Sequence, residues 1–364
     1  MGAVGEDDSA AQGGSLPLFS RDAAISAARA LFLRTEDDEK NTRSVNPKTG
    51  RIGRGFLPWG AESGAAGHFE SKEGFAFGYD HTPAACASDL QNLMEELNVW
   101  PDSAGEALGA IAVGASSGST TSASVREVLG EETLAVLNDV GRLLVRAYSL
   151  DFHGDEFRLV REWLSDHPSA KGSPERWNLT RVFRYFRSTK GREQMDRETA
   201  RKNAAFGSVP HTDWGLLTVI AACDEPGLQL LQKPQDGDGG AETYVTVLPR
   251  FHEGKLFVNC GDFMSLMSGD RYVSPRHRVL APLPKPDQDD VERTSIVHFY
   301  YPKYDVELPP IEDQPQCLRE KYSVFADQRE QKDGGDAPGA DACGDKRNPI
   351  FGDTIAKKWT QVAR

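Results

Sequence analysis

The stretch HTDWGLLTVIAA at residues 211–222 sets two metal-binding side chains, His211 and Asp213, at the head of a short apolar run. Residues two positions apart on an extended segment point to the same side, so one strand end delivers an imidazole and a carboxylate together. The apolar run that follows is short and β-branched, which is typical of a buried strand. The stretch therefore predicts a metal site that is carried by a β-sheet.

A third ligand has to come from a distant strand that folds back beside the first. His277 meets this condition, because turn residues divide the intervening chain into short segments that can fold as hairpins. Two imidazoles and one carboxylate leave three positions of an octahedral ion open, which is typical of non-haem Fe(II) oxygenases. We therefore predict that Fe(II) is bound by His211, Asp213 and His277.

Two other histidines compete for a ligand role. His252 lies in a segment typical of an exposed turn. His298 lies on the last predicted strand, where alternation places it on the face opposite Arg293. We therefore expect His298 to be a core histidine.

The chain from Trp177 onwards consists of short β-rich runs separated by Gly, Pro and Asp. This spacing predicts an antiparallel sandwich or jelly roll rather than alternating strands and helices. The predicted strands cover residues 178–187, 216–222, 227–231, 244–248, 255–259, 279–281 and 295–301.

Helices are predicted mainly outside this region. A helix is expected to begin at Ser20, and a longer one to cover residues 124–150 with a broad apolar stripe. We expect residues 36–67 to be mostly loop, and residues 156–164 and 355–362 to be helical.

A candidate acid clamp lies on the last predicted strand. Arg293 can form a bidentate pair with a carboxylate, and Ser295, on the same face, can donate a further hydrogen bond. A 2-oxo acid needs this arrangement, because one carboxylate is held by the clamp while the other end of the molecule chelates the metal.

These motifs resemble the Fe(II)/2-oxoglutarate-dependent dioxygenases of the isopenicillin N synthase-like family. The resemblance covers about residues 50–310 and is most specific in the C-terminal motifs. It is carried by HTDWGLLT at 211–218, GLQL at 227–230, VNCGD at 258–262, HRV at 277–279, RTSI at 293–296, FYYP at 299–302, RGFLP at 54–58 and KEGFAFG at 72–78.

The resemblance implies a mainly β fold: a distorted double-stranded β-helix, or jelly roll, wrapped by N-terminal and C-terminal helices. It implies co-substrate contacts for Arg293, Ser295 and Tyr185, and substrate contacts for Phe299 and Trp214. Relatives often carry Asn where this chain has Phe183, so the contact to the near carboxylate of the co-substrate is left open. Accordingly we divide the chain into a disordered leader (1–15), a helical N-terminal region (16–170), the catalytic core (171–310) and a tail with a mobile loop and closing helix (311–364).

The function predicted by this resemblance is oxidation of a C–H bond of a small organic metabolite, using Fe(II), 2-oxoglutarate and O₂ and releasing succinate and CO₂. Hydroxylation, desaturation and cyclisation stay open. One alternative is an isopenicillin N synthase-like oxidase that uses no 2-oxoglutarate. Another is a non-catalytic jelly-roll binding protein. A hydrolytic Zn(II) site is disfavoured, because no general base is visible near the triad.

The overall charge bears on the partners. The 364 residues carry a net charge of −13 without a long basic run, which disfavours nucleic acid and anionic membrane surfaces as partners. The five cysteines show no paired spacing, and the first residues lack a secretory signal pattern, so we expect a cytoplasmic protein with reduced thiols. The sequence leaves the prime substrate and the oligomeric state open.

Overall fold

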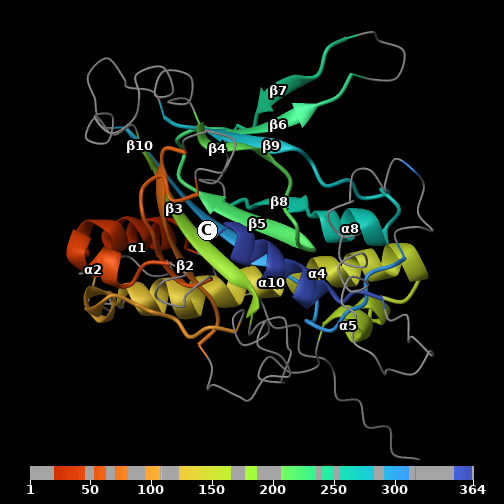
Figure 1. Cartoon of the computed structure of the whole chain (residues 1–364), viewed down its shortest axis with the longest axis horizontal. Helices are drawn as coiled ribbons and strands as arrows, with labels where there is room; N and C mark the ends of the chain where they lie inside the picture. Colours follow the sequence, from red (N-terminus) through yellow and green to blue (C-terminus); the bar gives the residue numbers. More distant parts are fainter. Residues whose placement is uncertain are drawn as a thin grey trace, which may run out of the picture.

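The protein contains two antiparallel sheets; helices flank the larger one, and β6 and β7 of the smaller one project away from the helices (Figure 1). The structure is a computed structural model. It describes residues 20–45, 53–62, 70–80, 95–106, 108, 123–164, 177–186, 206–234, 240–248, 254–282, 291–310, 316 and 348–362.

The larger sheet has six strands in the order β1-β2-β3-β10-β5-β8, and the smaller has four in the order β4-β9-β6-β7. The strands are β1 (Gly55–Leu57), β2 (Lys72–Phe77), β3 (Leu179–Phe186), β4 (Phe206–His211), β5 (Leu217–Ala222), β6 (Leu228–Gln232), β7 (Thr243–Thr246), β8 (Phe257–Cys260), β9 (His277–Leu280) and β10 (Glu292–Tyr300).

The helices lie mainly around the larger sheet. They are α1 (Arg21–Arg34), α2 (Asp37–Thr42), the 3₁₀ turn η2 (Asp102–Gly105), the π-helical segment η3 (Glu127–Thr133) that runs into α4 (Leu134–His153), α5 (Arg158–Trp163), α8 (Asp262–Met267) and α10 (Phe351–Val362). The helix α4 ends at Gly154, whose φ of +67° suits a residue without a side chain.

The larger sheet is buried on both faces, so its strands carry apolar side chains on both sides, with buried polar residues such as Lys72, Arg181 and Arg293 among them. One face packs against α1, η3 and α4, and contributes residues such as Val182, Val219 and Ile296 to that core. The other face turns toward the smaller sheet and α10, with Phe183, Ile220 and Val297 among its residues. Successive side chains of a strand alternate between faces, so each strand supplies both cores.

The predicted mainly β fold with flanking helices is confirmed, and the two sheets form the double-stranded β-helix. The helix beginning at Ser20 is also confirmed: the Ser20 hydroxyl accepts a hydrogen bond from the Ala23 amide at 3.4 Å. The long helix predicted at 124–150 corresponds to η3 and α4, and the closing helix begins earlier than predicted, at Phe351.

Two predictions are incomplete. Residues 36–67 contain α2 and β1 among those described, alongside the predicted loop. Residues 16–170 are not only helical, because β1 and β2 extend the larger sheet. The strand β2 was missed because it begins with Lys72 and Glu73, polar residues that pair with other charges inside the protein.

The strand β4 was missed for a different reason. It contains Pro210, which cannot donate a hydrogen bond to a neighbouring strand. The strand tolerates this proline because it lies at the edge of the smaller sheet, and its register with β9 shifts between Ser208 and His211.

Several regions fall outside the described residues. They include the leader (1–15), most of the predicted loop of the tail, and His252. The domain boundaries stay predictions. Within the described ranges, none of the helices combines the length and the apolar character that crossing a bilayer requires.

Gly261 makes the tightest backbone contact near the metal-binding residues. A Cβ atom on it would lie 2.1 Å from the carbonyl oxygen of Gly215, in the turn that follows Asp213. We expect Gly261→Ala to lower the free energy of unfolding by about 2 kcal/mol or more, as overpacking does, measured by urea denaturation. Gly105→Ala is the control, because its Cβ would meet nothing within 4 Å. Equal stability of the two variants would contradict the close packing of this turn.

Candidate functional site

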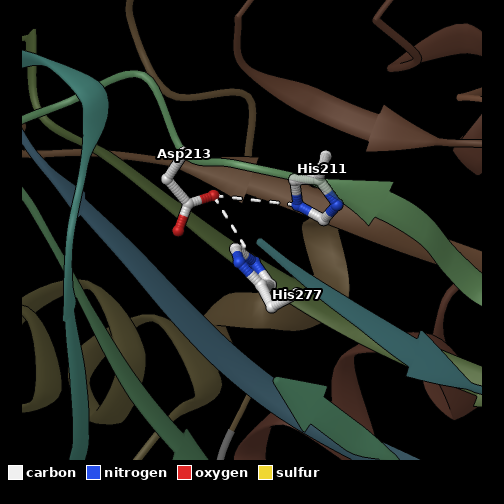
Figure 2. A group of neighbouring side chains, drawn as sticks. All are labelled: His211, Asp213 and His277. Atoms are coloured by element: carbon white, nitrogen blue, oxygen red, sulfur yellow. Dashed lines mark ion pairs between the residues drawn. The ribbon is translucent and has the colours of Figure 1, made fainter. Parts of the chain in front are cut away.

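His211, Asp213 and His277 lie together at one end of the smaller sheet (Figure 2). His211 is the last residue of β4 and His277 the first of β9, and the two are paired across the strands. The Oδ1 atom of Asp213 lies 3.7 Å from Nε2 of His211 and 3.8 Å from Nε2 of His277. The three potential ligand atoms lie within 4.8 Å of one another, so they could hold one metal ion.

The two imidazole rings are oriented by backbone carbonyls. Nδ1 of His211 lies 2.6 Å from the carbonyl oxygen of Val209, and Nδ1 of His277 lies 3.0 Å from that of Pro275. A proton on each Nδ1 donates to these carbonyls and leaves the Nε2 lone pair free for a metal. Partial desolvation at the cavity wall, and then the neighbouring charge of His277, lower the pKa of the half-buried His211 and favour the neutral ring.

The carboxylate of Asp213 is held by two side chains that the sequence did not single out. Its Oδ2 atom accepts a hydrogen bond from Thr218 Oγ1 at 2.6 Å and another from Asn259 Nδ2 at 2.9 Å. Burial by itself raises the pKa of Asp213, but the two histidines and these hydrogen bonds outweigh it, so the pKa lies below its usual value. The carboxylate is therefore fixed as an anion with Oδ1 turned toward both histidines.

We expect Asn259→Ala to weaken iron binding about 10- to 100-fold, since side chains that orient a metal ligand carry effects of this size. A metal titration measures the change. Asn138→Ala is the matched control: Asn138 is also a buried amide, but it bonds to Leu134 and Asn178 instead of a metal-site residue. Wild-type iron affinity in Asn259→Ala would contradict the orienting role.

Arg293 and Ser295 lie on β10 and face the same cavity as the triad, with Tyr185 beside them on β3. Only 3% of Arg293 is exposed, and its Nε and Nη1 atoms have no hydrogen-bond partner among the described residues. Its guanidinium lies 5.1 Å from the ring centre of Tyr185, whose hydroxyl accepts a hydrogen bond from Ser295 at 3.4 Å. A buried cation with spare donors suits an anionic ligand.

The cavity between the sheets has a volume of about 260 Å³ and brings all the predicted site residues together. Phe299 and Trp214 line it, so the structure places both beside the triad. His298 points to the opposite face, as predicted. Its Nδ1 lies 2.8 Å from Thr180 Oγ1, and burial lowers its pKa to about 3.

Four charged residues of the cavity wall were missed from the sequence: Glu62, Glu70, Lys72 and Arg181. Lys72 Nζ lies 2.9 Å from Glu62 and 2.7 Å from Glu70, and Arg181 pairs with the other oxygen of Glu62. Burial by itself raises the pKa of Glu62, but the charges of Arg181 and Lys72 lower it to about 2. We call this chain of alternating charges the ionic quartet.

The helix α10 closes the cavity on another side. Trp359 lines the cavity, and its ring centre lies 5.3 Å from that of Trp214 in an edge-to-face arrangement. The guanidinium of Arg181 lies 4.3 Å from the ring centre of Trp359. The tail predicted as a closing helix thus contributes a side chain to the cavity, which the sequence did not reveal.

Comparison with known proteins bears on this site. Residues 177–302 match the family model described as the 2OG-Fe(II) oxygenase superfamily. Jasmonate-induced oxygenase 2 of Arabidopsis thaliana is 32% identical over 114 residues, or 31% of this chain and 26% of that protein. Validamycin A dioxygenase of Streptomyces hygroscopicus subsp. limoneus is 35% identical over 102 residues, or 28% of this chain and 25% of that protein. The matched part of the chain spans about a quarter of the length of these two relatives.

The fold is also shared with solved structures. A full-length Neurospora crassa protein, crystallised in complex with alpha-KG and thymine, superposes with a TM-score of 0.55 at 17% identity, covering 82% of this chain and 77% of that chain. At this identity the likeness shows the fold alone.

Proposed function

We propose that this chain, whose residues 177–302 match the family model of the 2OG-Fe(II) oxygenase superfamily, is an Fe(II)- and 2-oxoglutarate-dependent dioxygenase. The reaction we propose oxidises a C–H bond of a small organic metabolite and releases succinate and CO₂. One observation carries the proposal: a His-Asp-His cluster and a buried arginine with unpartnered N–H groups, among the described residues, line the same cavity.

In this proposal each part of the site has a separate task. His211, Asp213 and His277 hold the iron, and their imidazole and carboxylate donors suit Fe(II). When bound, the iron supplies the redox chemistry that activates O₂. Arg293 and Ser295 bind the far carboxylate of 2-oxoglutarate, beside Tyr185.

Substrate contacts are proposed for Phe299 and Trp214, which line the cavity near the triad. Apolar walls of this kind exclude water and orient a small molecule. The Neurospora crassa protein of the same fold has been crystallised with alpha-KG and thymine, which supports a small-molecule substrate here. A cytoplasmic location stays a prediction, supported by the unpaired thiols of Cys223 and Cys260.

The decisive experiment measures the fate of 2-oxoglutarate. The purified chain is incubated with Fe(II), O₂ and 2-oxoglutarate carrying a label at the near carboxylate, with and without pools of candidate metabolites. We expect labelled CO₂ and succinate in equal amounts, and faster release when a metabolite is accepted. Oxidation of a metabolite without any succinate would favour the oxidase alternative and contradict the proposal.

A further inference from the structure

Arg181 is a second buried cation in the cavity, distinct from Arg293. It lies on β3, where Tyr185 pairs with Arg293 and Arg181 pairs with Val297 on β10. The two arginines therefore lie on neighbouring strands, with one inward-facing position, that of Phe183 and Ser295, between their levels in the sheet. Only 3% of Arg181 is exposed, and its side chain lines the cavity beside Trp359.

Within the ionic quartet, Arg181 is the cation that keeps an unpartnered N–H donor among the described residues. The ammonium of Lys72 has three donors, and Glu62, Glu70 and Ser208 lie at 2.9, 2.7 and 3.4 Å from its Nζ. One oxygen of Glu62 pairs with Lys72 and the other with Arg181.

Both oxygens of Glu70 have donors as well, since the oxygen that does not face Lys72 accepts from the Val209 amide at 2.7 Å. Arg181 differs, because it uses Nη1 for Glu62 while its Nε has no partner among the described residues.

The unpartnered Nε edge of Arg181 has the donor chemistry of a carboxylate site. The Nε and the adjacent terminal nitrogen of a guanidinium form a planar fork that matches two carboxylate oxygens. Glu62 occupies the other side of the guanidinium, so it does not block this fork. Trp359 covers the guanidinium face at 4.3 Å from its ring centre, which holds the fork in place.

We propose that the Nε edge of Arg181 binds a carboxylate of the prime substrate, with Trp359 of α10 as the wall behind it. This inference rests on the proposed function and adds the substrate class: a small organic acid whose carboxylate lies at Arg181 while the co-substrate carboxylate lies at Arg293. The ionic quartet contains two carboxylates and two cations, so its charges balance before the substrate arrives. The unpartnered Nε edge of Arg181 therefore selects the substrate, and the ionic quartet has no surplus of positive charge that could do so.

The test compares a carboxylic acid with its neutral isostere. The acid is 3-phenylpropanoate and the isostere is 3-phenylpropanamide. Each is titrated anaerobically into the chain loaded with Fe(II) and 2-oxoglutarate, and separately into the metal-free chain. Calorimetry and tryptophan fluorescence report binding. We expect the acid to bind about tenfold more tightly than the amide, because a charge-assisted fork is roughly twice as strong as neutral hydrogen bonds. Arg181→Gln should remove this preference.

The matched control is Arg184→Gln. Arg184 lies on the same strand but pairs with Glu73 and Glu292, and it does not line the cavity. This variant should keep the preference for the acid. Equal affinity for acid and amide in the wild type, no saturable binding of the acid up to millimolar concentration, or an unchanged preference in Arg181→Gln would overturn the inference.

The visible charge-transfer band of iron-bound 2-oxoglutarate separates the two proposals. Arg181→Gln is expected to keep this band. If the variant loses the band that the wild type shows, Arg181 serves the co-substrate and the inference is wrong while the proposed function stands. If the wild type itself shows no band, the proposed function fails, and the acid preference of the metal-free chain then tests Arg181 separately.

Discussion

Replacing Asp213 by alanine is expected to abolish turnover and to lower the affinity for iron by at least about a hundredfold. Changing a residue that only orients a metal ligand lowers metal affinity by up to about a hundredfold. Loss of the ligand itself should lower it further. The physical reason is the loss of the one described carboxylate whose oxygen faces both histidines, at 3.7 and 3.8 Å from their Nε2 atoms. Two imidazoles remain, and neither neutralises the charge of a divalent metal.

Iron content after dialysis and the rate of succinate release measure this prediction. Asp151→Ala is the control, because Asp151 pairs with Arg271 at the surface and lies outside the cavity. Circular dichroism shows whether the variant keeps its fold, since the change also leaves Thr218 and Asn259 without their acceptor. An Asp213→Ala variant that binds iron and releases succinate as the wild type does would refute the ligand assignment.

The parts of the site that were predictable from the sequence follow from local geometry. Alternation along β10 places Arg293 and Ser295 on one face and His298 on the other, and the structure has this arrangement. The spacing of His211 and Asp213 works in the same way, although Asp213 lies just beyond the end of β4. In both cases a period of two residues suffices, because neighbouring side chains of an extended chain point in opposite directions.

The ionic quartet could not be predicted, because its members come from segments that only the tertiary fold brings together. Glu62 lies between β1 and β2, Glu70 just before β2, and Arg181 on β3. Read singly, each is a charged residue that belongs on the surface. The desolvation cost of burying these charges is offset only when opposite charges pair in the folded protein. The order of the residues in the sequence does not show which charges will pair.

The position of Trp359 shows a related limit. The apolar pattern of residues 355–362 predicts a helix, and that helix is present as part of α10. A helix pattern does not reveal which cavity its side chains reach. The contact of Trp359 with Trp214 and Arg181 depends on where α10 packs against the two sheets.

Arg293→Ala is expected to eliminate the charge-transfer band of bound 2-oxoglutarate at concentrations that saturate the wild type, while iron binding stays unchanged. Losing one partner of a buried, hydrogen-bonded charge pair costs about 2–5 kcal/mol, so the Kd of 2-oxoglutarate should rise roughly 30-fold or more. No described carboxylate pairs with Arg293, so its removal leaves no buried anion unpaired among the described residues. The loss should therefore fall on the co-substrate rather than on the fold.

An anaerobic titration of 2-oxoglutarate into the iron-loaded variant measures this effect, with Arg184→Ala as the control from the opposite face of β3. Arg293→Lys should be intermediate, because it restores a charge without the planar fork. If Arg293→Ala binds 2-oxoglutarate with wild-type affinity, the clamp is wrongly assigned. If the wild type binds iron but shows no band, Arg293 serves a substrate carboxylate instead, as the oxidase alternative requires. Tests on Arg293 thus distinguish the 2-oxoglutarate-dependent dioxygenase from the oxidase alternative. Both place an anion at this buried cation, but only the dioxygenase places 2-oxoglutarate there.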